Sequence, residues 1–386
     1  ALLLGSICIK IKLPSLFGML IAGIVLGPYV LDLIAPSLLG ISPDLRQLAL
    51  IIILTRAGLN LNLKDLKKNG LSAVLLCFVP ASAEILAYML LGALILQMNV
   101  LDAAIMGCVM AAASPAVIVP RMLKLKETEY GTDKGIPDML MTGASADDVF
   151  VIVLFTSLTA MAGGCSFSWN IVWQMPVSIV LGIGVGIVIG LLFVMLIKKI
   201  HMRDSIKIIL ILSIAFLFIA LENAIEQWVP FSGLLAVIAF GAAVFAKHAI
   251  CAERLSQKFS KLWVFAEILL FVLVGAEVNI QYALQNCGPI ICVILLALIF
   301  RMGGVFLCVA KSKLNMKEKL FCMVTYTPKA TVQAAIGAIP LTMGLTCGQT
   351  VLTAAVLGIL ITAPLGALLT DITCKKLLTK TAMEKI

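Results

Sequence analysis

The segment TGASADDVFVIVLF at residues 142–155 decides how this 386-residue chain folds. The apolar sequence continues on both sides, over about residues 137–162, which is long enough for a helix to cross a bilayer. Two adjacent acids, Asp147 and Asp148, lie near its middle. A carboxylate at membrane depth is costly unless it is paired, hydrated or protonated, and such acids mark ion and proton pathways. The segment therefore predicts a membrane-spanning helix that carries an ion or proton site.

The rest of the chain is equally apolar. Hydrophobic residues make up 62% and charged residues 13% of the sequence, whereas soluble domains are roughly a quarter charged. A chain this apolar would expose too much hydrophobic surface to water, so we expect its surface to face lipid. We predict an all-α polytopic membrane protein with about thirteen transmembrane helices. They are expected near residues 1–12, 14–35, 44–63, 69–97, 101–123, 137–162, 171–199, 205–224, 230–246, 256–277, 285–311, 318–341 and 348–374.

The net charge of +9 does not indicate nucleic-acid binding, because the basic residues sit in clusters between apolar segments. Clusters such as Lys64, Lys67 and Lys68 follow the odd-numbered segments, whereas loops after even-numbered segments carry acids such as Asp102. By the positive-inside rule, the odd loops and the C-terminus face the cytosol.

The eleven cysteines are scattered, without a CxxC or Cys/His cluster. We therefore expect no metal centre, no disulfide framework and no cofactor. The chain starts at Ala1 inside an apolar run, so preceding sequence is expected to be missing. The glycines 182, 184, 186 and 190 are predicted to allow close helix packing.

Similar features recur at a nearly constant distance along the chain. The matched positions are Gly58 with Gly275 and Glu84 with Arg301, each 217 residues apart, and Ser114-Pro115 with Thr327-Pro328, 213 residues apart. This offset spans an odd number of segments, so the second copy is inverted in the membrane. Inverted repeats are typical of transporters whose site lies at the repeat interface.

The aspartate pair suits exchange chemistry. Two carboxylates this close cannot both ionise cheaply, so the empty site holds a proton and releases it when a cation arrives. The carboxylates of Asp147 and Asp148, with hydroxyls such as those of Ser114 and Thr142 and with carbonyl oxygens, suit a hard cation such as Na⁺. The alternative is a structural pair that caps a broken helix or binds a neighbouring cationic side chain.

Two helix breaks occupy matching places in the repeats. Pro115 and Pro328 each remove a helical donor, after Ser114 and Thr327 respectively. Facing half-helix ends present partial charges, and Lys329 is expected to neutralise the converging carbonyl ends. The alternative is ordinary proline kinks with Lys329 reaching an interface.

Glu84 and Arg301 are predicted to form a buried salt bridge, because they occupy matching repeat positions near mid-span. Its role, in holding two helices or in transport, stays open. Arginine remains protonated in proteins, so Arg301 is not itself a proton carrier. Arg56 and Glu267 are weaker candidates for a gating or structural pair.

Several of these motifs resemble the cation/proton antiporter superfamily. They are the Ser114-Pro115 and Thr327-Pro328-Lys329 breaks, GASADD at residues 143–148 and GMLIAGIVLGP at residues 18–28. The paired aspartates are similar to the NHA-type branch, and their surroundings resemble animal sodium/hydrogen exchangers of solute carrier family 9, subfamily B. Relatives in that branch carry additional N-terminal sequence.

The resemblance implies a homodimer in which a core slides like an elevator against a dimerisation scaffold. Two broken helices would cross in the core beside Asp147 and Asp148, with Asp148 the essential cation and proton site and Asp147 accompanying it. The scaffold would comprise residues 1–65 and 166–283, and the core residues 66–165 and 284–386. The location would be the plasma membrane, or an endosomal or mitochondrial membrane.

Two positions depart from the pattern of the family. Many relatives have a lysine in place of Arg301; the arginine is expected to be held by Glu84 instead, which puts electrogenic two-proton exchange in question. Many also carry an acid in the first broken helix, where this chain has only Ser114, so the charges around Lys329 would be balanced differently.

We therefore predict exchange of Na⁺ or Li⁺ for H⁺. A sodium-coupled organic-anion transporter of the same fold is the alternative, with Lys329 as its anion-binding cation. An intramembrane aspartyl protease needs aspartates on different spans, so no enzyme is expected. A channel is a further alternative, and flux that saturates and depends on a counter-ion would argue against it.

Overall fold

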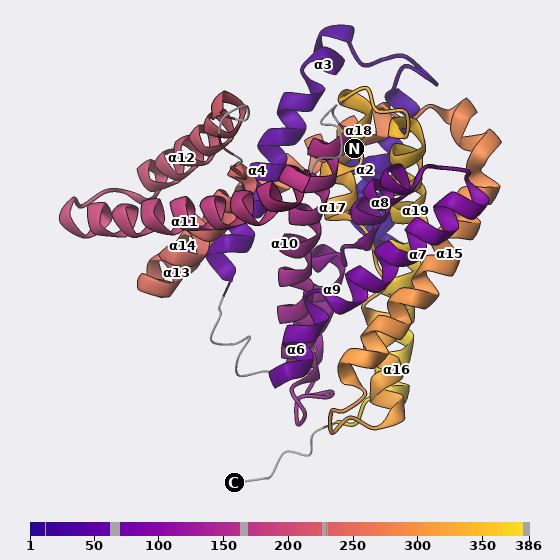
Figure 1. The fold of residues 1–386 in the computed structure, drawn as a ribbon. Helices are drawn as coiled ribbons and strands as arrows, with labels where there is room; N and C mark the ends of the chain where they lie inside the picture. Colours follow the sequence, from indigo (N-terminus) through magenta and orange to yellow (C-terminus); the bar gives the residue numbers. More distant parts are fainter. Residues whose placement is uncertain (12, 62–69, 163–168, 226–228, 230, 381–386) are drawn as a thin grey trace. The chain divides into compact units, whose positions relative to one another are not determined.

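A computed structural model describes residues 1–11, 13–61, 70–162, 169–225, 229 and 231–380, with only the backbone of residues 145, 146 and 169–176. The basic cluster of Lys64, Lys67 and Lys68 lies outside this part of the chain. The helices, labelled in Figure 1, are α1 (Leu2–Lys10), α2 (Ser15–Leu26), α3 (Pro36–Gly40), α4 (Ser42–Asn60), α6 (Gly70–Leu76), α7 (Val79–Ile95), α8 (Val100–Ala111), α9 (Pro115–Glu127), α10 (Ile136–Ala162), α11 (Trp169–Lys199), α12 (Asp204–Ile225), α13 (Gly233–Lys247), α14 (Ala249–Ala276), α15 (Ile280–Val309), α16 (Met316–Thr325), α17 (Thr331–Ile336), α18 (Ile339–Thr342) and α19 (Gly348–Leu377).

The predicted all-α membrane architecture is confirmed. Within the described ranges, eight helical segments are long and apolar enough to cross a bilayer, and three shorter apolar helices accompany them. The eight are Gly70–Ile95, Val100–Glu127, Ile136–Ala162, Val177–Lys199, Asp204–Ile225, Ala249–Ala276, Ile280–Val309 and Gly348–Leu377. The count of about thirteen transmembrane helices stays a prediction.

Several helix ends differ from the predicted segments. The segment expected over 14–35 is helical only to Leu26, because Gly27 and Pro28 follow. The segment expected over 69–97 is divided into α6 and α7, since Pro80 lies in the first turn of α7 and its ring nitrogen has no hydrogen to donate. The segment expected over 318–341 is divided among α16, α17 and α18, and Pro340 opens the last of these.

The chain divides into two compact units. Unit 1 comprises residues 1–40, 64–158 and 271–386, and unit 2 comprises residues 41–63 and 159–270. Two of the boundaries predicted between core and scaffold, at residues 65/66 and 165/166, lie close to the boundaries between the two units at residues 63/64 and 158/159. Residues 1–40, however, belong to the same compact unit as both broken segments. The assignment of either unit as a sliding core or a scaffold stays a prediction.

Gly58 and Gly275 make equivalent close packing contacts. A Cβ atom on Gly58 in α4 would lie 2.5 Å from the carbonyl oxygen of Ile238 in α13. A Cβ atom on Gly275 in α14 would lie 2.4 Å from the carbonyl oxygen of Leu20 in α2. The same backbone-to-backbone packing therefore occurs at two positions that are 217 residues apart, as expected for inverted repeats.

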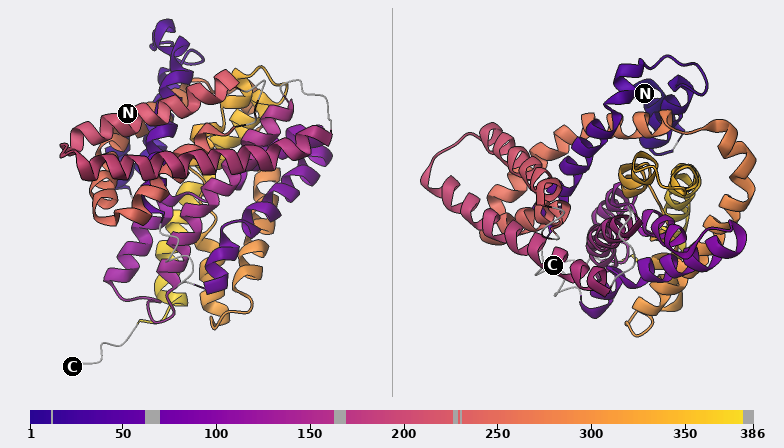
Figure 2. Two further views of the ribbon diagram at one scale, coloured as in Figure 1. Left: turned by 60° about the vertical axis from the view of Figure 1, so that its left-hand side comes forward. Right: turned by 45° about the horizontal axis from the view of Figure 1, so that its top comes forward.

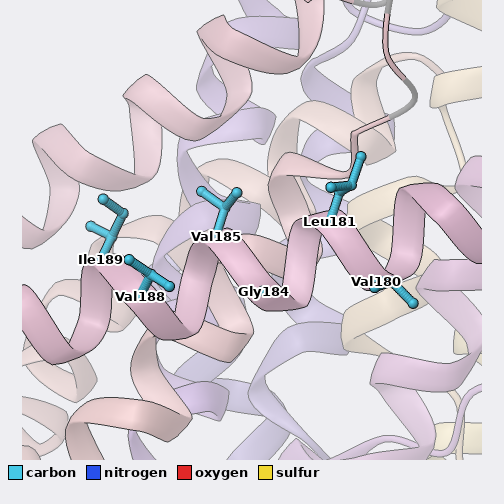
Figure 3. Close-up of a pocket in the computed structure, with 6 residues that line it drawn as sticks. All are labelled: Val180, Leu181, Gly184, Val185, Val188 and Ile189. Atoms are coloured by element: carbon cyan, nitrogen blue, oxygen red, sulfur yellow. The ribbon is translucent and has the colours of Figure 1, made fainter.

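In unit 2, glycines on one face of α11 allow the backbone of α13 to approach closely. A Cβ atom on Gly182, Gly186 or Gly190 would lie 2.6, 2.4 or 2.8 Å from a carbonyl oxygen of α13 or its N-cap residue. Gly184 meets nothing within 4 Å. Figure 3 shows it on an apolar stretch of α11 with Val180 and Val188, which are 68% and 55% exposed. The small-residue packing prediction thus holds for the other three glycines.

This contrast gives a matched pair of substitutions. Gly186→Ala is expected to lower the thermal unfolding temperature of the purified protein, because the new methyl group would overlap the carbonyl oxygen of Ala236, 2.4 Å away. Gly184→Ala should leave it unchanged or slightly raised, since a helical alanine is favoured over glycine. Thermal unfolding in detergent measures both, and equal unfolding temperatures would contradict the packing described here.

Candidate functional site

The two helix breaks meet within unit 1. The helix α8 ends at Ala111 and α9 begins at Pro115, while α16 ends at Thr325 and α17 begins at Thr331. The backbone N–H of Ser114 donates to the carbonyl oxygen of Pro328 over 2.8 Å, so one break contacts the other directly. Figures 1 and 2 show α8, α9, α16, α17 and α19 as parts of one helical cluster. The predicted breaks at Pro115 and Pro328 are therefore present.

Arg301 on α15 binds the carbonyl ends of both interrupted helices. Its Nε donates to the carbonyl oxygen of Tyr326, the C-cap residue of α16, over 2.7 Å. One of its terminal nitrogens donates to the carbonyl oxygen of Ala111, the last residue of α8. The guanidinium therefore neutralises two partial negative charges that helix dipoles bring together.

The sequence predicts this role for Lys329, but the structure gives it to Arg301. Guanidinium carries several N–H donors in a planar fork, so it serves both carbonyl oxygens and carboxylates at once. Lys329 instead directs its Nζ to Oε2 of Glu84, 2.5 Å away. Its backbone N–H donates to the hydroxyl of Thr362 on α19 over 2.8 Å.

Four fully buried charges form a continuous network. Arg301 bonds Glu84 at 2.9 Å and Asp147 at 2.8 Å, and Lys329 is bonded to the same Glu84 oxygen. All four side chains have no exposed surface. The ion pair expected between Glu84 and Arg301 is thus present, but Arg301 is shared with Asp147 rather than held by Glu84 alone. Two cations and two carboxylates balance within this network.

The two aspartates of α10 have different surroundings. Oδ2 of Asp147 accepts bonds from Arg301 and, over 2.9 Å, from the backbone N–H of Ala113. Asp148 is 7% exposed, and no cation is paired with it among the residues that the structure describes. One buried oxygen of each aspartate, Oδ1, has no hydrogen-bond partner within the described ranges. Asp148 is therefore a carboxylate in excess of the neutral network.

The hydroxyls expected at the site are used unequally. Oγ of Ser114 is buried and has no partner within the described part of the chain. The hydroxyl of Thr142 donates to the carbonyl oxygen of Asp138 one turn earlier in α10, over 2.7 Å. That of Thr327 donates to the carbonyl oxygen of Val324 over 2.8 Å. Of these three, Ser114 has the hydroxyl that is left available to a ligand.

Comparison with known proteins now identifies the family. The profile of the transmembrane sodium/hydrogen exchanger family matches residues 1–376. The chain belongs to the sodium/hydrogen exchanger family. It is 34% identical to Sodium/hydrogen exchanger 9B2 of Xenopus tropicalis over 404 residues, which cover 99% of this chain and 74% of the relative. The human protein of that name is also 34% identical, with 95% and 70% covered, and human Sodium/hydrogen exchanger 9B1 is 30% identical, with 95% and 73% covered.

A solved structure has the same fold. The sodium proton antiporter MjNhaP1 from Methanocaldococcus jannaschii superposes with a TM-score of 0.84 at 22% identity, and the match covers 97% of this chain and 95% of that one. The resemblance to exchangers of subfamily 9B and the antiporter fold are thereby confirmed.

Sequence reasoning missed other polar groups of this site in unit 1. Nε2 of Gln333 on α17 donates to the carbonyl oxygen of Ala112 over 3.0 Å. The hydroxyl of Tyr326 donates to the carbonyl oxygen of Leu76 over 3.1 Å. Both residues are polar and flank the break at Pro328 inside an apolar segment. This position is the feature of the sequence that indicates a place in the site.

Arg56 and Glu267 are not members of the buried network. Both belong to unit 2, Arg56 on α4 and Glu267 on α14. Their opposite charges attract each other, in keeping with the candidate pair that the sequence indicates. A gating or structural role for this pair stays a prediction.

Proposed function

We propose that this protein exchanges Na⁺ or Li⁺ for H⁺ across a membrane, with the cation and the proton competing for Asp148 beside Asp147. Family membership and the antiporter fold support exchange of sodium for protons. The elevator-like sliding of a core, the homodimer and a cytosolic C-terminus are parts of the same proposal.

The observation that carries the proposal is the excess carboxylate of Asp148. Glu84 and Asp147 are neutralised by Lys329 and Arg301, whereas Asp148 is buried without a paired cation among the described residues. An isolated buried carboxylate is far too costly to persist, so it must take up either a proton or a metal cation. These two alternatives are the two substrates of an exchanger.

The fixed network gives Asp147 a different part in the proposal. Arg301 and the N–H of Ala113 hold its Oδ2, so its Oδ1 remains for a cation bound mainly by Asp148. Ser114 contributes a buried hydroxyl oxygen. Carboxylate and hydroxyl oxygens suit a hard monovalent cation that has lost part of its water shell.

The organic-anion alternative needs a cation that faces the substrate. The sequence offers Lys329 for this role, but its ammonium group is bonded to Glu84 at 2.5 Å and has no exposed surface. A free ammonium for a carboxylate substrate would require breaking that pair. The arrangement therefore favours an inorganic cation as the substrate.

Reconstituted flux tests the proposed function. Proteoliposomes that contain the protein and an internal pH indicator are exposed to an inward gradient of NaCl, LiCl, KCl or choline chloride. We expect proton efflux with Na⁺ or Li⁺ and none with choline, and no organic substrate should be needed. Absence of a cation-dependent pH change in vesicles with correctly inserted protein would overturn the proposal.

The charge balance also predicts the stoichiometry. One carboxylate exceeds the balanced network, and Arg301 does not release a proton at physiological pH. One Na⁺ is therefore expected to exchange for one H⁺, without net charge movement. Imposed potassium diffusion potentials of either sign should leave the initial exchange rate unchanged. A rate that rises with one polarity and falls with the other would contradict one-for-one exchange.

A further inference from the structure

We propose that Gln333 is a positioning residue for cation binding, which acts on Asp147 through the peptide group between Ala112 and Ala113. The inference rests on the proposed function and adds to it a residue outside the aspartate pair. Gln333 is fully buried in α17, downstream of the second break.

Both ends of one peptide group are held by different helices. The carbonyl oxygen of Ala112 accepts from Nε2 of Gln333 over 3.0 Å. The N–H of Ala113, which belongs to the same peptide group, donates to Oδ2 of Asp147 over 2.9 Å. The amide plane is rigid, and its carbonyl and N–H point in opposite directions. The bond from Gln333 therefore sets the direction in which the N–H meets the carboxylate.

The chemistry fixes the orientation of the Gln333 amide. Its contacts are carbonyl oxygens, namely that of Ala112 and, over a longer 3.5 Å, that of Met110. Only the NH₂ end of a glutamine donates to such acceptors. These contacts also join α17 to the end of α8, close to the bond between Ser114 and Pro328. The Ala112–Ala113 peptide lies outside both α8 and α9.

Holding this peptide limits how the Asp147 carboxylate can turn. Its Oδ2 is fixed by the Ala113 N–H and by Arg301, which leaves Oδ1 without a partner within the described part of the chain. Partners that orient a ligand in this way tune cation affinity although they do not touch the cation. Loss of the Gln333 donor would free the peptide to rotate and would move the carboxylate from its cation-binding position.

The test replaces Gln333 by methionine, which has similar length and no amide. In the proteoliposome assay, Gln333→Met should raise the half-saturating Na⁺ concentration about tenfold and keep the maximal rate within a factor of about three. Gln349→Met is the matched control, the same exchange in α19 at a glutamine whose Oε1 has no hydrogen-bond partner among the described residues, and it should match the wild type. Gln333→Leu is a second variant, since its apolar side chain has no group that can donate to Ala112, and it should weaken Na⁺ binding at least as much.

The outcomes separate this inference from the proposed function. If the wild-type protein exchanges Na⁺ for H⁺ and both Gln333 variants have the wild-type half-saturating Na⁺ concentration, the positioning role alone is overturned. A fall in maximal rate without a change in that concentration, which a merely structural role would produce, also overturns it. Absence of exchange in the wild type overturns the proposed function and this inference with it. Size-exclusion profiles in detergent identify a variant that has not folded, in which case the other Gln333 variant decides.

Discussion

Replacement of Asp148 by asparagine is expected to reduce sodium-driven proton flux at least about 100-fold, because the loss of even a partner that only orients a metal ligand costs about 10- to 100-fold. Asparagine has the same shape as aspartate, but its uncharged amide neither takes up and releases a proton near neutral pH nor neutralises a cation. The buried network of Glu84, Asp147, Arg301 and Lys329 is complete without Asp148, so the variant should fold. Flux in proteoliposomes with a pH indicator measures the loss.

Asp138→Asn is the matched control for this variant. Asp138 lies in the first turn of the same helix, where its side chain is 44% exposed and pairs with Lys126 at 2.7 Å. The same substitution there removes only an exposed ion pair, so exchange should persist near the wild-type rate. Sodium-dependent proton flux retained by Asp148→Asn would contradict the role of that aspartate.

Replacement of Arg301 by methionine is expected to lower the stability of the folded protein by about 3–5 kcal/mol, the usual cost of removing one partner from a buried ion pair. The change leaves Glu84 with Lys329 alone and leaves Asp147 without a cation. It also exposes the carbonyl ends of α8 and α16 to each other. Thermal unfolding in detergent, followed by tryptophan fluorescence, should show a large fall in unfolding temperature.

Two further variants sharpen the stability test. Arg254→Met removes an arginine that is 55% exposed and pairs with Asp204 at 2.9 Å, so its cost should stay below about 1 kcal/mol. Arg301→Lys keeps the charge but loses the fork, and it should fall between the wild type and the methionine variant. An Arg301→Met protein that unfolds at the wild-type temperature would refute the central place given to this side chain.

Much of the architecture follows from local sequence. Apolar runs give the helices, and proline removes a backbone donor, which places the breaks at Pro115 and Pro328. The paired positions of Glu84 and Arg301 in the repeat indicate their contact, because equivalent positions of two inverted copies face one another. The motifs around Asp147 also identify the family, which the comparisons confirm.

The distribution of bonds within the network could not be predicted in the same way. Arg301 reaches Asp147 across 154 positions of sequence, and Lys329 reaches Glu84 across 245. The apolar sequence around a charged residue indicates that its side chain is buried. Which of several carbonyl or carboxylate oxygens that side chain then binds depends on where its end lies in space. For this reason the sequence assigned the carbonyl ends to Lys329, and it gave no sign that Gln333 binds the peptide of Ala112.

Helix boundaries show a related limit. Pro28 and Pro80 are visible in the sequence, yet a continuous apolar run hides whether proline kinks a helix or ends it. In the structure α2 ends before Pro28, while Pro120, Pro289 and Pro364 are accommodated inside α9, α15 and α19. Neighbouring helices decide this outcome, since they supply or withhold partners for the freed backbone groups.

Proton release on addition of Na⁺ tests most directly whether a cation and a proton compete for Asp148. Purified protein in weakly buffered detergent solution is titrated with NaCl while a pH indicator reports free protons, with choline chloride as the ionic control. We expect release of about one proton per chain as the cation displaces it, and none from Asp148→Asn. Sodium binding without proton release, or equal release from the variant, would contradict the account.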